Sequence, residues 1–177
     1  MQDRQSALTV IQNAVHNEVS GQRFYSDAAR SCIDLWTKEM FASLAAEEEV
    51  HTRLLLVEYE SLSTRGRWID HETALDRDPG IDITAFSFPE SELDGELFPA
   101  HGSSSQNVDR TMDDLSALAL GIGMEQKAIN LYTQAADATD DSAAREAYEF
   151  LVIEETRHRD QLRGQWERLA GRAFEAA

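Results

Sequence analysis

Cysteine is almost absent from the 177 residues of this sequence, in which Cys32 stands alone. A single cysteine excludes an intrachain disulfide, and it excludes zinc or iron–sulfur sites that need several thiolates. The sequence also lacks a secretory signal and any apolar run near the roughly 20 residues that span a bilayer. We therefore expect a soluble, cytoplasmic protein with no membrane partner.

Positive charge is scarce as well. Only 16 lysines and arginines stand against 33 aspartates and glutamates, which gives a formal net charge of −17. Binding to a phosphate backbone needs clustered positive charge, so we expect no nucleic-acid partner. The acidic surface would keep the protein in solution and would also attract cations.

Proline is confined to one part of the chain. All three prolines, and the run Gly-Ser-Ser-Ser at 102–105, lie within residues 63–108. This composition predicts a long, mostly irregular crossover. We expect a short extended piece around Trp68 and Ile69, and we expect His71 and His101 to face solvent.

The rest of the sequence has apolar residues at helical spacing. It predicts four helices, at about 6–31, 34–62, 111–137 and 141–170, with Asp34 as the N-cap of the second. We expect an all-α fold in one domain spanning residues 1–177, a four-helix bundle of two helical hairpins joined by the crossover at 63–108.

The two halves of the sequence match each other at an offset of 107 residues, without a gap. The matching pairs include Glu18 and Glu125, Tyr25 and Tyr132, Asp34 and Asp141, Leu44 and Leu151, Glu48 and Glu155, and His51 and His158. An internal repeat of this kind predicts two equivalent hairpins related by a pseudo-twofold axis.

Each half carries a glutamate followed three residues later by a histidine, first Glu48 with His51 and then Glu155 with His158. Three helical steps rotate the side chain by about 300° and rise by about 4.5 Å, so both side chains stand on one face, one turn apart. A carboxylate oxygen and an imidazole nitrogen placed in this way can bind the same metal ion or neighbouring ones.

The first and third helices each add one glutamate in an apolar or small-residue setting, Glu18 and Glu125. Four carboxylates and two imidazoles are the ligand set of di-iron and di-manganese carboxylate bundles. We therefore predict a site for two iron ions, or for manganese, with these metal ligands: Glu18, Glu48, His51, Glu125, Glu155 and His158. A degenerate, metal-free bundle is the alternative interpretation.

Residues next to this set have expected roles of their own. Tyr25 and Tyr132 lie seven residues beyond the lone glutamates, on the same helix face, and could hydrogen-bond the ligand carboxylates or simply pack in the core. Glu47 and Glu154 point about 100° away from the ligands that follow them, and we expect them to be solvated or paired with arginine.

These motifs resemble the rubrerythrin-like branch of the ferritin-like superfamily, over all four predicted helices. The resemblance is carried by Glu18 with Phe24-Tyr25, Leu-Ala-x-Glu-Glu-x-x-His ending at His51, Glu125 with Tyr132, and Leu-x-x-Glu-Glu-x-x-His ending at His158. It implies a ferritin-like bundle with a di-iron centre that reduces hydrogen peroxide or oxidises ferrous iron.

Two departures from the family pattern stand out. Rubrerythrins usually add a rubredoxin-like domain with four cysteines, and this chain has only Cys32. They also carry an additional glutamate one turn after the third-helix ligand, where this chain has Ala128, matched by Gly21 in the first half. Both differences argue against peroxidase chemistry that depends on those groups.

Three functional hypotheses follow. In the first, the protein is a di-iron oxidoreductase with Glu18, Glu48, Glu125 and Glu155 as catalytic carboxylates. It would react with peroxide or dioxygen, with Glu48 and Glu155 bridging the metals and Glu18 and Glu125 terminal. It would need an external electron donor and would form a homodimer or a higher homo-oligomer. The second hypothesis is iron storage or delivery, and the third is a non-catalytic bundle that binds another protein through the crossover.

Overall fold

Four long helices account for most of the chain. The computed structural model describes residues 2–83 and 113–175, and in these ranges all regular secondary structure is helical. The long helices are α1 (Gln2–Ser31), α2 (Leu35–Arg65), α4 (Asp114–Ala138) and α5 (Ser142–Ala170), and α3 (His71–Leu75) is a short helix after α2. The prediction of an all-α fold is confirmed, and the predicted helices match the observed ones to within a few residues.

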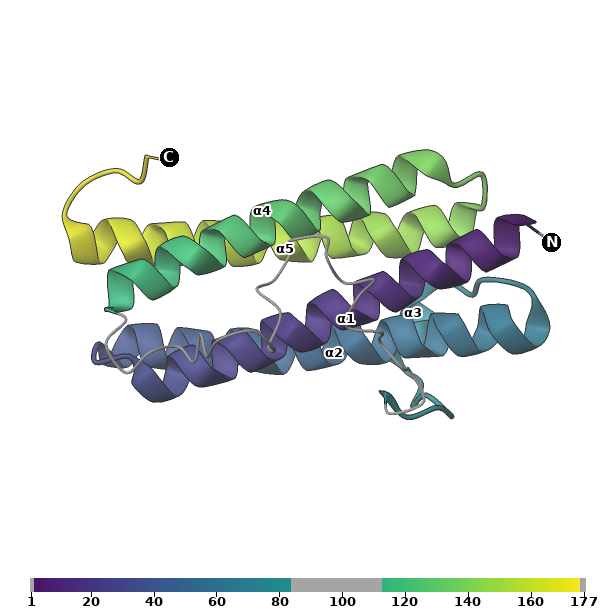
Figure 1. Cartoon of the computed structure of the whole chain (residues 1–177), viewed down its shortest axis with the longest axis horizontal. Helices are drawn as coiled ribbons and strands as arrows, with labels where there is room; N and C mark the ends of the chain where they lie inside the picture. The colour runs from purple at the N-terminus through teal and green to yellow at the C-terminus, as the bar shows by residue number, and fades with distance from the viewer. Residues whose placement is uncertain (1, 84–112, 176–177) are drawn as a thin grey trace, which may run out of the picture.

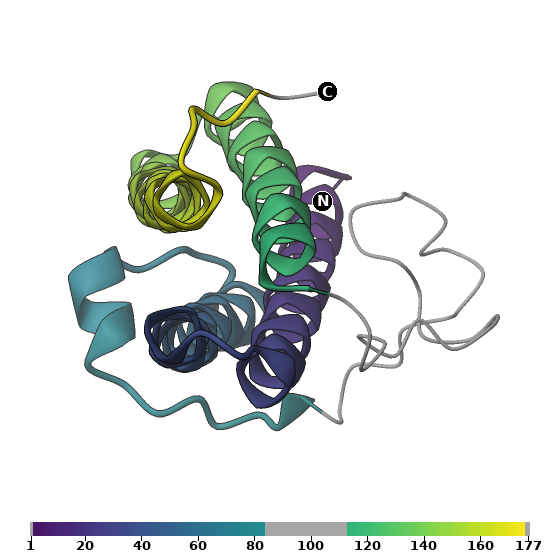
Figure 2. The same ribbon diagram turned by 90° about the vertical axis from the view of Figure 1, so that its left-hand side faces the viewer.

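The long helices form two antiparallel hairpins. α1 packs along α2 and α4 packs along α5, and the two hairpins lie against each other as a helical bundle (Figure 1). Viewed along the bundle, α4 lies next to α1 and α5 next to α2 (Figure 2). The two hairpins inferred from the internal repeat are therefore present.

The start of α4 lies beside the turn between α1 and α2. The main-chain N–H groups of Ile33 and Asp34 donate hydrogen bonds to the carboxylate of Asp114, at 3.0 and 2.7 Å. Because α2 runs away from that turn, its end and the beginning of α4 lie at opposite ends of the bundle (Figure 1). The segment joining α2 to α4 thus connects opposite ends, as the crossover prediction requires. Residues 84–108 of that crossover, including His101, lie outside the described residues.

Aspartate side chains cap the N-termini of α2, α3, α4 and α5. Asp34 accepts from Thr37 N at 2.9 Å, as predicted, and its repeat mate Asp141 accepts from the first main-chain N–H groups of α5. A carboxylate here satisfies amides that have no partner in the helix and opposes the positive end of the helix dipole. At the other end of α2, Gly66 adopts a left-handed conformation with φ of 69°, which closes the helix and lets the chain turn away.

The apolar core is divided into two clusters with a polar layer between them. One cluster contains Leu8, Ile11, Val15, Leu54, Leu55, Tyr132, Tyr148 and Leu151 among its buried residues. The other contains Tyr25, Phe41, Leu44, Leu118, Ile122, Leu162 and Trp166. On every long helix the lone glutamate or Glu-x-x-His pair falls between these two sets, so packing on both sides holds the polar side chains in place.

The described part of the crossover packs against the bundle. α3 contacts α2 and α5 (Figure 2), and Trp68 and Ile69 pack on the first apolar cluster as coil, so the extended piece expected there is not a strand. The expectation that His71 faces solvent is wrong: its ring is half-buried and stacks on Phe150 at 5.3 Å between centroids. The stacking is possible because α3 lies over α5, and the local sequence does not predict this contact.

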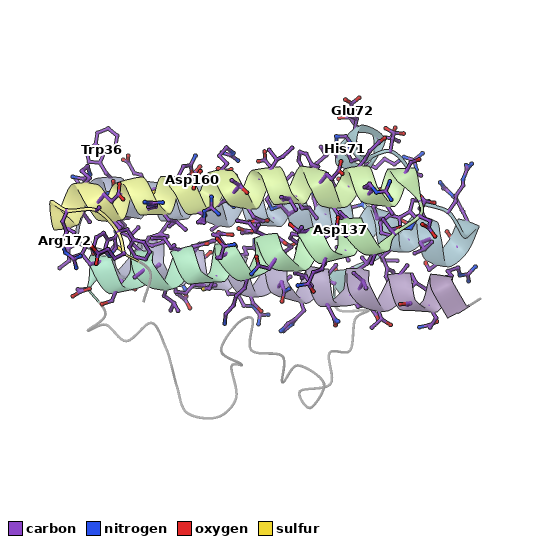
Figure 3. All side chains as sticks on the ribbon, turned by 90° about the horizontal axis from the view of Figure 1, so that it is seen from above. Trp36, His71, Glu72, Asp137, Asp160 and Arg172 are labelled. Atoms are coloured by element: carbon purple, nitrogen blue, oxygen red, sulfur yellow. The ribbon has the colours of Figure 1, made fainter. Side chains whose placement is uncertain are left out.

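Three exposed apolar side chains lie together at the α1–α2 turn, Ile33, Leu35 and Trp36, and Ile153 on α5 is exposed as well. Figure 3 shows Trp36 projecting at the same end of the bundle as Arg172. Among the described residues, no helix is both long enough and apolar enough to cross a membrane.

Candidate metal centre

The structure brings the six predicted ligands together at the middle of the bundle. α1 supplies Glu18, α4 supplies Glu125, and α2 and α5 each supply a Glu-x-x-His pair. All six residues are buried, with at most 3% of their surface exposed. Carboxylates are rarely buried without a compensating partner, so their burial together points to a bound cation.

The six residues form two overlapping groups in which ligand atoms lie within 4.8 Å of one another. The first group is Glu18, Glu48, His51 and Glu155, and the second is Glu48, Glu125, Glu155 and His158. Glu48 and Glu155 belong to both. This is the arrangement that the bridging hypothesis requires, with Glu18 and Glu125 each serving one group, and metal ligation itself remains a prediction.

Both histidines turn the Nδ1 atom toward the carboxylates. His51 Nδ1 lies 3.1 Å from Glu155 Oε1, and His158 Nδ1 lies 3.1 Å from Glu155 Oε2. The two imidazole rings are stacked, with centroids 5.4 Å apart and planes 20° from parallel. The two groups therefore receive one imidazole nitrogen each, from His51 in the first and from His158 in the second, on either side of Glu155.

The electrostatics of the centre are dominated by burial and by like charge. Burial, and then the neighbouring carboxylate of Glu155, raise the pKa values of Glu48 and Glu125 well above the usual range for glutamate. Burial would also raise the pKa of Glu155, but the hydrogen bond from His158 and the nearby imidazole of His51 outweigh it and hold that pKa low. Burial lowers the pKa of His51, and hydrogen bonds to Glu155, Glu18 and Glu48 more than reverse this. Without metal, the centre therefore keeps protons that two divalent cations would displace.

Two tyrosines join the hairpins through the terminal carboxylates. The Tyr25 hydroxyl on α1 donates to Glu125 Oε1 on α4, and the Tyr132 hydroxyl on α4 donates to Glu18 Oε1 on α1. Burial, followed by the adjacent carboxylates, raises the pKa of both hydroxyls, so they stay protonated as donors. Each tyrosine thus orients a carboxylate of the opposite hairpin, and both are fully buried in the core as well.

The donor set fits a metal pair. Glu155 Oε1 is buried and has no hydrogen-bond partner among the described residues, although His51 Nδ1 lies nearby. The hydrogen bonds found to the four carboxylates come from two tyrosines and two histidines, which leaves buried oxygen lone pairs without donors. Oxygen-rich ligation with one imidazole per group suits iron or manganese, and four carboxylates balance the charge of two divalent ions.

A small cavity lies beside the carboxylates on the α1–α4 side. Its volume is about 10 Å³, close to the space of one water molecule, and Glu48, Glu125 and Glu155 line part of it. Gly21 and Ala128 also line it. The position at which rubrerythrin-like proteins carry an additional glutamate, Ala128 here, is therefore next to open space in this protein.

Gly21 lines this cavity, and the presence of glycine inside α1 should lower the stability of the protein by a measurable amount. A Cβ atom at this position would lie 3.6 Å from Glu48 Cγ and Cδ, an ordinary van der Waals contact. Because alanine is favoured over glycine inside a helix, we expect Gly21→Ala to stabilise the protein by about 0.5–1 kcal/mol. The added methyl group should also narrow the cavity and slow reaction of the loaded centre with oxidant. Urea unfolding and stopped-flow kinetics measure the two effects, and unchanged stability with unchanged rate would contradict this account of Gly21.

The outer side of the centre contains a contact that the sequence did not reveal. Arg157 pairs with both Glu47 and Glu154, so the expected pairing with arginine is found. In addition, Glu47 Oε2 lies 3.1 Å from His158 Nε2, across the interface of α2 and α5. Residues 47 and 158 are on different hairpins, and no local spacing relates them.

No family model matches this chain, and no curated protein or solved structure shows significant similarity to it. The resemblance to rubrerythrin-like proteins therefore rests on the motifs around the six residues. Function has to be proposed from the chemistry and geometry of the centre.

Proposed function

We propose that the protein is a ferritin-like di-iron oxidoreductase that reacts with peroxide or dioxygen. The observation that carries this proposal is the pair of overlapping four-residue groups with Glu48 and Glu155 in common. Two buried metal positions that share two carboxylates suit a two-electron reaction of a small oxidant more than they suit a purely structural role.

Two bound iron ions, or manganese in their place, would supply the electrons and the Lewis acidity for reduction of an oxygen–oxygen bond. The chain's own residues bind and orient. Glu48 and Glu155 hold the two positions together, while Tyr25 and Tyr132 fix Glu125 and Glu18 through hydrogen bonds from the opposite hairpin. The apolar clusters on both sides restrict water around the centre.

The size of the cavity supports a small substrate. A volume of about 10 Å³, enough for about one water molecule, leaves no room for an organic substrate without rearrangement. An external reductant is needed for turnover, because the chain has only Cys32 and so cannot build a cysteine-ligated iron relay.

The test is peroxide or dioxygen consumption by protein loaded anaerobically with Fe(II). We expect consumption that depends on the bound iron and that is lost in Glu48→Ala, because that substitution removes a carboxylate common to both metal positions. Metal analysis of the same samples separates loss of metal from loss of reaction. A protein that binds two irons per chain and remains inert toward both oxidants would contradict the proposal.

The excess negative charge favours iron storage or delivery as a second candidate. A net charge of −17 would draw Fe(II) toward the protein, and the same centre could oxidise it. Uptake that stops at two irons per chain, in a dimer, would favour the oxidoreductase. Continued uptake in a hollow shell of many copies would favour storage.

A further inference from the structure

We infer that Glu47, held by Arg157, positions the imidazole of His158 and thereby makes the two metal positions unequal. This inference rests on the proposed metal centre and adds a partner to it from outside the six ligands. The repeat alone predicts two equivalent metal positions. In the structure they differ, because the outer nitrogen of His158 contacts a carboxylate.

Glu47 is fixed by partners on two helices. Its Oε1 accepts a hydrogen bond from Ser43 Oγ at 2.9 Å on α2, and its Oε2 accepts from Arg157 Nη2 on α5. Arg157 in turn donates to Glu154 Oε2 at 2.6 Å. The guanidinium therefore draws Glu47 across the α2–α5 interface and holds it over His158.

The Glu47 carboxylate meets the outer nitrogen of a fully buried ring. His158 is 0% exposed, and its Nε2 lies 3.1 Å from Glu47 Oε2. An ionised carboxylate only accepts hydrogen bonds, so the proton of this contact belongs to Nε2. A neutral imidazole with its proton on Nε2 presents an unprotonated Nδ1, which is the atom that faces Glu48, Glu125 and Glu155.

His51 lacks the matching arrangement because the repeat fails at one position. The residue that corresponds to Arg157 at the offset of 107 is Val50, which cannot bind a carboxylate. Glu154, which corresponds to Glu47, lies near both imidazoles and is also bound by Arg157. Of these two glutamates, however, only Glu47 forms a hydrogen bond with a ligand histidine in the described part of the chain. Among the described residues, the hydrogen bond found for His51 uses Nδ1, and its ring packs against Phe150 with the planes 86° apart and the centroids separated by 6.3 Å.

A carboxylate on the outer nitrogen fixes the tautomer and the orientation of a ligand histidine and increases its basicity. The position that His158 serves should therefore bind a divalent cation more tightly than the position that His51 serves. Removal of such an outer partner usually lowers metal affinity by about 10–100-fold, and here the loss should fall on one of the two metals.

The experiment is an anaerobic Co(II) titration of the full chain, followed by ligand-field absorption and competition with a chelator. For the wild type we expect two binding steps of different affinity. In Glu47→Gln the tighter step should weaken by about 10–100-fold and its absorption should shift, while the weaker step stays in place. Glu49→Gln is the matched control, because it makes the same change two residues away on the exposed side of α2, and it should titrate as the wild type does.

Arg157→Ala provides a second variant, which leaves Glu47 in place but releases it from its clamp. It should weaken the same step by less than Glu47→Gln does. Identical titrations of wild type and Glu47→Gln would overturn the inference and leave the metal centre standing. Equal loss from both steps would also overturn it. A wild-type chain that binds no Co(II) would instead contradict the metal centre itself, and this inference with it.

Discussion

Glu48→Gln is expected to cost the protein both metal ions, whereas Glu18→Gln is expected to cost it one. Glu48 belongs to both groups of ligand atoms and Glu18 to only one. An amide in place of a shared carboxylate removes an anionic oxygen from each position, while the change at Glu18 leaves the group around His158 complete. Metal analysis after anaerobic reconstitution with Fe(II) or Mn(II) measures the stoichiometry.

Thermal unfolding provides a second readout of the same substitutions. A ligand present at 100 times its Kd stabilises the fold by about 2.7 kcal/mol, which for a protein of this size raises Tm by about 5–11 °C. We expect this rise in the wild type and its loss in Glu48→Gln. Without metal, Glu48→Gln should be more stable than the wild type near neutral pH. It removes a carboxyl group whose ionised form is disfavoured by burial and then by the charges of Glu155 and Glu18, whereas the unfolded chain ionises it freely. A variant that loses metal because it unfolds would instead be less stable under both conditions.

Equal stoichiometry in the Glu48 and Glu18 variants would contradict the shared arrangement. Two separate mononuclear sites would lose one ion each, and a surface site would lose none. The comparison therefore separates a coupled pair of metals from independent binding.

Glu58→Gln is expected to stabilise the protein by about 3 kcal/mol at pH 8 and to have little effect near pH 4.5. Glu58 lies on α2, is 0% exposed, and accepts a hydrogen bond from the Ile69 main-chain N–H at 3.2 Å. Its other oxygen has no hydrogen-bond partner in the described part of the chain. Burial, opposed by the Ile69 hydrogen bond and aided by Asp141 and Asp70, raises the pKa of Glu58 from 4.5 to about 7.

The sign of this effect follows from which state binds the proton more tightly. The folded protein holds the Glu58 proton up to about pH 7, and the unfolded chain releases it near 4.5. The stabilisation from the protonated form is complete below the unfolded pKa and is lost as the pH rises through the folded one. Glutamine is neutral at every pH, so the advantage of the variant grows across the interval from 4.5 to 7 and then levels off.

Urea unfolding of the metal-free protein at several pH values measures this difference. Comparing variant and wild type at each pH cancels the titration of the metal centre, which both share. The exposed substitution Glu49→Gln should show no comparable trend. A difference in unfolding free energy that does not change between pH 5 and pH 8 would show that Glu58 is not held protonated by burial.

Both predictions concern buried carboxylates, but the two sites differ in what compensates them. At the centre, four carboxylates converge with two imidazoles, and cations can replace the bound protons. Glu58 has one main-chain donor and, among the described residues, no hydrogen bond from a histidine, so a proton neutralises it at low pH. The two sites should therefore respond differently to added metal. Metal should stabilise the fold through the cluster of ligands, and it should have no effect on the solitary Glu58.

The sequence by itself determined the helices, their hairpin pairing and the six residues of the centre. A helix repeats every 3.6 residues, so the spacing of Glu48 to His51 and of Glu155 to His158 fixes a common face before any packing is known. The offset of 107 residues then relates the hairpins, and an aspartate cap such as Asp34 depends only on the residues that follow it. These patterns are local or repeated, so they can be recognised in the sequence without knowledge of how the helices pack.

Only the tertiary structure decided which residues meet across helices. It placed Tyr25 on the glutamate of the opposite hairpin, set Glu47 over His158 and buried Glu58. The sequence already predicts Glu48 and Glu155 as the carboxylates that both groups share. The structure also corrected His71, which stacks on Phe150 because α3 packs on α5. The physical reason is that helical periodicity fixes the direction of a side chain relative to its own helix axis. The rotation and separation of two packed helices depend on all the side chains between them, so contacts across that interface have no signature in a single stretch of sequence.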